Sequence, residues 1–263
     1  MSDCMQFNPG FEIWPIKNPI GFHYGENVFG PQVEKRRLDD IRRSLQNPDC
    51  EGPEIVYAIA MDVGKKVHMD LLEKLHLLYG AVTYAAGKLG NEPVRSQGHV
   101  HKVSSFSQCS TPEVYEIWEG QAVIYMQEQA EDFPGKCFAV YAQPGDVVIV
   151  PPAWAHATIN ADPEQSLTFG AWCVRDFGFD YEGVRRHHGI AWFPVFNNRN
   201  ELEWKPNPLY KKSELICKDP GNYAALGIEK GVSIYQTFER SPESFAYIPQ
   251  PQLKKEVWKN FTP

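Results

Sequence analysis

The segment from Gly98 to Gly120, GHVHKVSSFSQCSTPEVYEIWEG, constrains the possible fold more than any other part of the chain. His99 and His101 are separated by one residue, and side chains at i and i+2 share a face when the backbone is extended. Glu113 begins what we predict to be the following strand, and His156 comes after a later apolar strand. The pattern predicts a metal site assembled on β-strands.

Three imidazoles and one carboxylate suit a divalent first-row metal such as Fe, Mn, Ni, Co or Zn. A structural zinc site would more often contain thiolates, which this pattern lacks. Each residue alone has an ordinary alternative: His99 and His101 as a surface or half-buried pair, Glu113 as a solvated carboxylate, and His156 as a turn residue. The combination of all four favours the metal site.

The composition favours strands and turns over a helical bundle. Of the 263 residues, 43% are apolar, and the chain contains 15 Phe, 12 Tyr, 7 Trp and 21 Pro. Aromatic residues are enriched in strands and prolines in turns. The net charge of −7 argues against an extended nucleic-acid interface, but it allows a local basic pocket for a phosphorylated metabolite.

The six cysteines indicate neither disulfides nor a thiolate metal site. They are Cys4, Cys50, Cys109, Cys137, Cys173 and Cys217, and no two of them form a CxxC pair. We therefore expect reduced thiols in a cytoplasmic protein. The first residues lack the pattern of a secretory signal, and no apolar run reaches the length of a transmembrane helix, so we expect no membrane association.

Short apolar segments separated by turn residues predict an antiparallel barrel or jelly roll. We predict strands at residues 55–60, 77–86, 94–102, 113–117, 121–127, 138–142, 147–150, 166–174, 191–196 and 201–205. Residues 34–47 carry Leu38, Ile41 and Leu45 at helical spacing and are predicted to form a helix.

We expect a single domain over residues 1–263. An N-terminal arm and helix (1–54) precede the barrel core (55–189). A C-terminal extension (190–263) wraps the barrel and contains a short amphipathic piece near residues 254–261.

Two cationic clusters each have two interpretations. The first contains Arg36, Arg37, Arg42 and Arg43. It is either a phosphate site or a solvated helix face paired with Asp39 and Asp40, and the charge pattern favours the solvated face. The second contains Arg185, Arg186, His187 and His188. It is either an anion site or a surface turn or helix end, and we favour the latter. His68 and His76 are interpreted as surface or packing histidines.

Three motifs resemble those of a known family. They are Gly98-His99-Val100-His101, Glu113-Val114-Tyr115, and Pro151-Pro152-Ala153-Trp154-Ala155-His156 followed by Asn160. In this arrangement the chain resembles the cupin-type glucose-6-phosphate isomerases, over roughly residues 36 to 212. The resemblance implies a mainly β fold, the cupin double-stranded β-helix or jelly-roll barrel, and usually a homodimer.

The resemblance also implies a ligand set and a substrate. His99, His101, Glu113 and His156 would bind one divalent metal, commonly iron, with manganese, nickel or zinc able to replace it. The substrate would be a phosphorylated sugar. Its contacts would come from Tyr57, Thr83, Ser96, Gly98, Tyr115 and Tyr181.

The implied reaction interconverts glucose 6-phosphate and fructose 6-phosphate, and a proton or a hydride moves between C1 and C2. Glu113 is our candidate for the base near the reacting carbon. Tyr115 would share its face and hydrogen-bond the sugar or phosphate, or else be a packed aromatic residue. A cupin dioxygenase, another sugar isomerase or epimerase, and a non-catalytic binding cupin remain alternatives, because the ligand set does not fix the reaction.

The chain departs from the short archaeal members of that family in several places. Trp172 stands where they usually carry a tyrosine, Phe179 replaces a histidine, and the tail beyond residue 212 is longer. The loop at 104–112 is also longer, and we expect it to lie at the mouth of the site and to affect substrate specificity.

Overall fold

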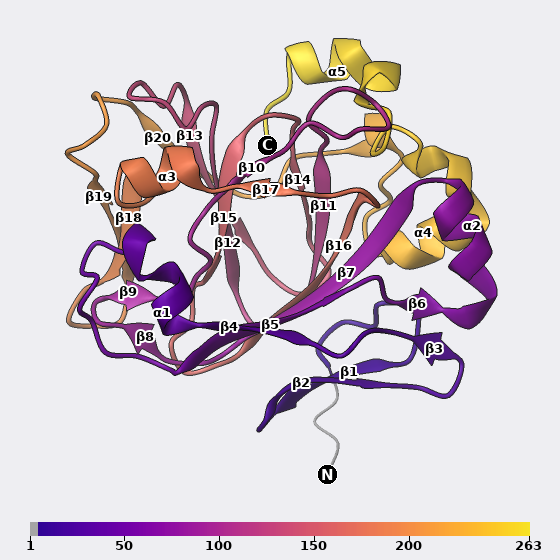
Figure 1. The fold of residues 1–263 in the computed structure, drawn as a ribbon, viewed down its shortest axis with the longest axis horizontal. Coiled ribbons are helices and arrows are strands. Elements are labelled where there is room, and N and C mark those ends of the chain that lie inside the picture. The colour runs from indigo at the N-terminus through magenta and orange to yellow at the C-terminus, as the bar shows by residue number, and fades with distance from the viewer. Residues whose placement is uncertain (1–4) are drawn as a thin grey trace.

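The computed structural model describes residues 5–263, and its dominant secondary structure is β-strand (Figure 1). The barrel strands are β4 (Glu34–Arg37), β5 (Ile55–Met61), β7 (Leu77–Tyr84), β11 (Glu113–Glu119), β12 (Ala122–Gln127), β13 (Cys137–Ala142), β14 (Val147–Val150), β15 (Ala155–Asn160), β16 (Leu167–Val174) and β20 (Leu215–Lys218). The other strands are β1 (Ile13–Lys17), β2 (Ile20–Tyr24), β3 (Val28–Phe29), β6 (Gly64–Lys65), β8 (Lys88–Leu89), β9 (Glu92–Pro93), β10 (Val100–His101), β17 (Phe179–Asp180), β18 (Trp192–Phe196) and β19 (Leu202–Pro206). The helices are α1 (Leu38–Ile41), α2 (Met69–Lys74), α3 (Glu182–Arg186), α4 (Ile234–Arg240) and α5 (Lys255–Lys259), with 3-10 turns at Arg42–Ser44, Lys66–His68, Ala224–Leu226, Pro242–Phe245 and Pro251–Lys254.

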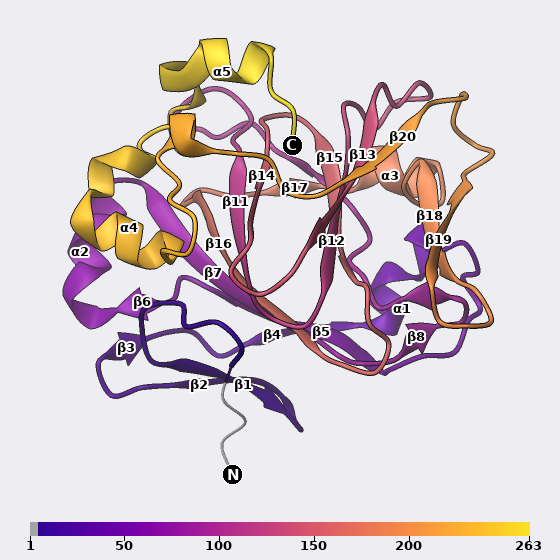
Figure 2. The same cartoon turned by 180° about the vertical axis from the view of Figure 1, so that it is seen from behind.

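Two sheets face each other and form the barrel (Figures 1 and 2). One has the strand order β14-β11-β16-β7-β5-β4, and the other has the order β15-β12-β13-β20. Neighbouring strands in these sheets are antiparallel except β13 and β20, which are parallel. This is the jelly-roll architecture of a double-stranded β-helix, and it confirms the predicted fold class.

Side-chain alternation along β16 separates the barrel interior from the outer face of its sheet. Phe169, Ala171 and Cys173 face inward and pack in a buried cluster with residues of the opposite sheet, such as Ile124. Trp172 points the other way and belongs to an outer cluster. A polar side chain at an inward position of this strand is therefore surrounded mainly by buried apolar side chains.

Both ends of the chain cover the outer face of the β14-to-β4 sheet (Figures 1 and 2). The β1–β2 hairpin contributes Ile13 and Phe22, and α4 contributes Tyr235 and Phe238, to one buried cluster. The ring of Tyr235 stacks on that of Trp172, with 5.6 Å between their centres. Because aromatic side chains bury large apolar areas, the C-terminal extension is an integral part of the core.

The predicted helix at 34–47 is only partly confirmed, because helical structure is confined to Leu38–Ile41 and the 3-10 turn at Arg42–Ser44. Its first residues form β4, where Arg36 pairs with Tyr57 of β5, and only Leu38–Ile41 is α-helical. The apolar residues at helical spacing are nevertheless buried. Pairing with a neighbouring strand stabilises an extended backbone that local spacing does not predict.

The strand predicted at 94–102 is shorter than expected. Only Val100–His101 forms regular strand, and Gly98 has φ +91°, a left-handed conformation that interrupts the extended backbone. Conversely, β15 is not among the predicted strands, although it carries His156.

Among the helices of residues 5–263, none has the length and apolar character needed to cross a membrane. The free thiols are those of Cys50, Cys109, Cys137, Cys173 and Cys217, whereas Cys4 lies outside the described residues.

Candidate metal centre

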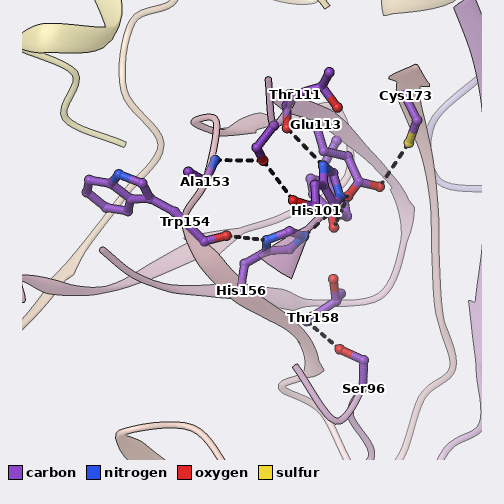
Figure 3. Close-up of polar contacts among 11 residues, drawn as sticks. Ser96, His101, Thr111, Glu113, Ala153, Trp154, His156, Thr158 and Cys173 are labelled. Atoms are coloured by element: carbon purple, nitrogen blue, oxygen red, sulfur yellow. Dashed lines mark hydrogen bonds and ion pairs between the residues drawn. The ribbon is translucent and has the colours of Figure 1, made fainter. Parts of the chain in front are cut away.

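Strand pairing brings the four predicted ligands together. His99 forms an antiparallel bridge with His156 of β15, His101 belongs to β10, and Glu113 begins β11. One ligand atom from each residue lies within 4.8 Å of the others. The stacked rings of His99 and His101 are 5.4 Å apart, as side chains on one strand face should be. Figure 3 shows His101, Glu113 and His156 pointing toward one another.

Main-chain carbonyls fix the orientation of two imidazoles (Figure 3). Nδ1 of His101 is 2.9 Å from the carbonyl oxygen of Thr111, and Nδ1 of His156 is 3.1 Å from that of Trp154. A carbonyl oxygen can only accept, so each Nδ1 donates, and Nε2 of the neutral ring carries no proton. Hydrogen bonds of this kind orient most metal-binding histidines.

The proton-free Nε2 atoms face the carboxylate of Glu113. Oε2 of Glu113 is 3.1 Å from Nε2 of His101 and 3.3 Å from Nε2 of His156. Such pairs of acceptors repel unless a proton or a cation lies between them. In addition, Nε2 of His99 is buried and has no hydrogen-bond partner. One divalent cation would satisfy all of these lone pairs, so the residues present fit such an ion.

Burial sets the protonation states of these groups. Desolvation, with the neighbouring histidines, lowers the pKa of His99 well below its ordinary value, and desolvation also lowers the pKa of His156. Burial alone would raise the pKa of Glu113, but when no cation is present, hydrogen bonds through protons shared with Nε2 of His101 and His156 hold that pKa well below the usual range. Neutral imidazoles beside an ionised carboxylate are the forms that bind metal.

Two further side chains hold Glu113. The Tyr115 hydroxyl donates to Oε2 at 2.9 Å. The Cys173 thiol donates to Oε1 at 3.3 Å (Figure 3). Burial and the charge of Glu113 raise the pKa of both groups well above their ordinary values, so both stay protonated. Cys173 is not among the predicted site residues. Its position follows from the alternation of side chains along β16, which turns Cys173 inward and Trp172 outward. Trp172, one of the expected differences from the resembling family, therefore lies on the face of the sheet away from the metal centre.

Three of the predicted substrate contacts lie beside this centre. The ring of Tyr181 is 5.8 Å from the ring of His99. The hydroxyl of Ser96 accepts a hydrogen bond from the main-chain nitrogen of Thr158 at 3.1 Å (Figure 3). Gly98 directly precedes His99, and its positive φ is one that glycine adopts without strain.

Tyr57 and Thr83 lie on opposite faces of their sheet. Tyr57 projects into the barrel interior and stacks on Tyr84, with 4.7 Å between ring centres. Thr83 precedes Tyr84 on β7 and therefore points outward, where its hydroxyl is 3.0 Å from that of Thr168. Strand alternation thus keeps Thr83 away from the metal centre, contrary to its predicted role in binding substrate.

The longer loop at 104–112 is anchored at both ends. Ser110 donates from its hydroxyl to the main-chain oxygen of His101 at 2.9 Å. Near the other end, the carboxylate of Asp176 accepts hydrogen bonds from the hydroxyls of Ser104 and Ser105 at 2.8 and 2.7 Å. The loop therefore holds the segment that carries His99 and His101.

Phe179 forms an apolar wall beside the same strand. It pairs with His101 between β17 and β10. Its ring lies 4.3 Å from the ring of His99 and 5.8 Å from that of His101. The chain thus places a hydrophobic ring against two of the ligands.

The match to a known family covers most of the barrel. The model of the family described as "Glucose-6-phosphate isomerase (GPI)" matches residues 43–211, which include all four clustered ligands. This chain belongs to the glucose-6-phosphate isomerase family. The elements β20 and α4 lie outside the segment that the family model matches.

Several glucose-6-phosphate isomerases resemble the chain over most of their length. That of Thermococcus litoralis is 29% identical over 182 residues, which are 67% of this chain and 86% of the relative. Those of Pyrococcus furiosus and Thermococcus onnurineus are each 32% identical, over 70% and 74% of this chain and 92% and 98% of the relatives. A solved structure of oxalate oxidase overlaps 47% of this chain and 53% of its own, with a TM-score of 0.35 and 11% identity, too little to bear on function.

Proposed function

We propose that this chain interconverts glucose 6-phosphate and fructose 6-phosphate at the centre formed by His99, His101, Glu113 and His156. The observation that carries the proposal is the convergence of these four side chains within the segment that matches the glucose-6-phosphate isomerase family. Aldose–ketose isomerisation moves a hydrogen between C1 and C2, and it needs stabilisation of the negative charge that develops on the sugar oxygens.

The four residues would hold one divalent cation. Iron(II) is our first candidate, with manganese, nickel or zinc able to substitute, because imidazole and carboxylate ligands accept all of these ions. When bound, such an ion supplies Lewis acidity, which polarises a carbonyl oxygen and stabilises negative charge on it.

Glu113 and Tyr115 are the proposed catalytic residues. Glu113 is ionised, as both a ligand and a base must be, and its contacts with Tyr115 and Cys173 fix the direction of its oxygens. A role as base requires Glu113 to exchange one of these contacts for the hydrogen on the substrate carbon. Tyr115 keeps its proton and can transfer its hydrogen bond from Glu113 to a sugar oxygen.

The phosphate group of the substrate would lie beside Tyr57, Ser96, Gly98 and Tyr181. Hydroxyl groups and main-chain N–H groups are suitable donors to phosphate oxygens. Thr83 is not part of this proposal, because it faces away from the barrel interior.

We also propose a homodimer that acts on phosphorylated metabolites in the cytoplasm. The resemblance to the family supports the dimer. Light scattering of the purified chain tests it, and a monomer at working concentration would contradict it.

A coupled assay of the conversion of fructose 6-phosphate to glucose 6-phosphate tests the activity. We expect turnover by the metal-replete wild type, loss on chelation, and recovery with Fe(II) or Mn(II). His156→Ala removes a ligand and should lower turnover by more than about a hundredfold, beyond what outer-shell changes cause. His23→Ala is the control, because His23 is exposed on the β1–β2 hairpin. Absence of turnover by metal-replete wild type would refute the proposal.

A further inference from the structure

A cationic side chain with one unpaired buried nitrogen, Arg36, faces the barrel interior close to the metal centre. Arg36 stands on β4 directly opposite Tyr57, and cross-strand neighbours project to the same face. Its side chain is 23% exposed, and its Nε is buried without a hydrogen-bond partner, as is Nε2 of His99. The expectation of a solvated helix face is therefore wrong for Arg36, which is neither helical nor outward-facing.

A second guanidinium approaches from α3. The guanidinium carbon of Arg185 lies 4.8 Å from the ring centre of Tyr181, and its Nε donates to Oε1 of Gln97 at 2.9 Å. Its ion pair with Glu182 spans 3.7 Å, and the Glu182 side chain is 73% exposed, so this pair is weak. Arg185 is thus anchored through Nε, and the weak pair with Glu182 leaves its terminal nitrogens able to bind a further acceptor.

Tyr181 lies within the field of both arginines. Burial raises the pKa of Tyr181, and the charges of Arg36 and Arg185 oppose that shift. Burial also raises the pKa of Tyr57, against the charge of Arg36 beside it. Both phenols therefore keep their protons and can donate hydrogen bonds next to two guanidinium groups.

The acidic partners of the two arginines are exposed, which leaves the guanidinium groups suited to bind a further anion. The acidic partner of Arg36 within the described residues is Glu34, whose side chain is 64% exposed. Glu34 lies mainly in water, so a phosphate group beside the two guanidinium groups would add charge-assisted hydrogen bonds that the exposed carboxylates supply only weakly. The protein as a whole has a net charge of −7, so this local positive potential is specific to the site.

We propose that Arg36 and Arg185 form a cationic clamp that binds the phosphate group of the substrate, with Tyr57 and Tyr181 as additional donors. Guanidinium groups bind phosphate through paired, charge-assisted hydrogen bonds. The clamp borders Tyr181, whose ring adjoins that of the metal-centre residue His99. A sugar with C1 and C2 at the metal centre thus places its far, phosphorylated end at the clamp. The identity of the sugar rests on the proposed function, whereas the specificity for a phosphate monoester rests on the two arginines.

Arg36→Met and Arg185→Met each remove one side of the clamp. We expect the KM for fructose 6-phosphate to rise by about 10- to 100-fold, as loss of a charged hydrogen-bond pair predicts. The value of kcat should change little, because phosphate contacts far from the reacting carbons act equally on the ground and transition states. Bound metal should be unchanged, and Arg36→Lys, which keeps the charge but not the fork, should recover part of the affinity.

The neighbouring arginines provide matched controls. Arg37→Met and Arg186→Met remove guanidinium groups that pair at the surface with Glu54 and Glu131. Each control changes the net charge by the same amount as its clamp variant. Neither should alter KM, so an effect of general charge is distinguished from an effect of the clamp.

Inorganic phosphate is a second probe, independent of turnover. Calorimetric titration should show phosphate binding to wild type and both controls, and at least about tenfold weaker binding to Arg36→Met and Arg185→Met. If wild type lacks isomerase activity but phosphate binding falls in these variants, the clamp stands and the proposed function fails. If both variants bind phosphate and fructose 6-phosphate as wild type does, the clamp is refuted. Should either substitution prevent folding, the other and Arg36→Lys decide the outcome.

Discussion

The two oxygens of Glu113 have different partners, and this division governs how the residue can act. Oε2 faces the imidazoles and accepts from Tyr115, whereas Oε1 accepts from the thiol of Cys173. Since Cys173 is fully surrounded by protein, its hydrogen bond fixes the carboxylate plane and directs Oε2 toward the space between the histidines. Outer contacts of this kind tune metal affinity by orienting the ligand.

Cys173→Ala removes the donor to Oε1 and allows the carboxylate to rotate. We expect the affinity for Mn(II) to fall about tenfold, a typical loss for an outer-shell partner. Cys173→Ser retains a donor and should keep most of the affinity. Competition between the protein and a fluorescent chelator for Mn(II) measures both.

Cys137→Ala is the matched control. Its buried thiol faces the carbonyl oxygen of Gly135 and the hydroxyl of Ser213, away from the ligands. Equal affinities for Mn(II) in wild type and Cys173→Ala would show that Glu113 is oriented without the thiol.

At the level of elements, α4 and the sheet that it covers share a buried carboxyl group. Glu116 of β11 accepts hydrogen bonds from the main-chain nitrogen of Ile234 at 2.7 Å and from Nε1 of Trp118 at 3.1 Å. Burial raises the pKa of Glu116 to about 8, despite these two bonds. Because Ile234 begins α4, docking of this helix involves a carboxyl that is protonated near neutral pH.

Glu116 is expected to contribute less and less to the stability of the folded chain as the pH rises from about 5 to about 8. Glu116 binds its proton more tightly when folded, so its contribution is complete below its unfolded pKa of 4.5 and is lost as the pH approaches 8. This one carboxyl can contribute a slope of at most about 1.4 kcal/mol per pH unit. The glutamine in Glu116→Gln does not titrate, so the free energy of unfolding in urea should fall less, or rise more, with pH across this range than it does in wild type, whatever its absolute value.

Glu119→Gln controls for the loss of a carboxyl from the same strand. Glu119 is only partly buried and lies 3.6 Å from Nζ of Lys17. The Glu119→Gln variant should show the same dependence of the free energy of unfolding on pH as wild type. The same slope in wild type and Glu116→Gln would mean that Glu116 ionises as readily in the folded as in the unfolded chain.

The contrast between β11 and β4 explains what the sequence can predict. The ligands near β11 are predictable, because the HxH spacing, the glutamate and the Pro-Pro turn are local patterns. β4 is extended because it pairs with β5, and that distant pairing turns Arg36 from the solvent into the barrel. Cys173 and Thr83 show the same limit, since a shift of one residue along a strand exchanges interior for exterior.

For the whole molecule, the metal centre connects the two sheets of the barrel. Glu113 comes from the β14-to-β4 sheet, His156 comes from the facing sheet, and His99 and His101 come from the segment that bridges to β15. Without a cation, the proton-free Nε2 atoms face a carboxylate. Metal binding should therefore raise the free energy of unfolding of the barrel, in addition to any role in catalysis.

Mn(II) added to metal-free protein at about a hundredfold excess over its Kd should stabilise the folded state by about 2.7 kcal/mol. For a chain of this size the unfolding midpoint should rise by about 5 to 10 °C, which thermal denaturation monitored by circular dichroism will measure. His99→Ala and His156→Ala each remove one ligand, from different segments of the centre, and should show little or no shift. A shift of equal size in both variants would place the bound ion elsewhere. No shift in wild type would show that the four side chains meet without holding an ion, and that the repulsion between their lone pairs is relieved by protonation instead.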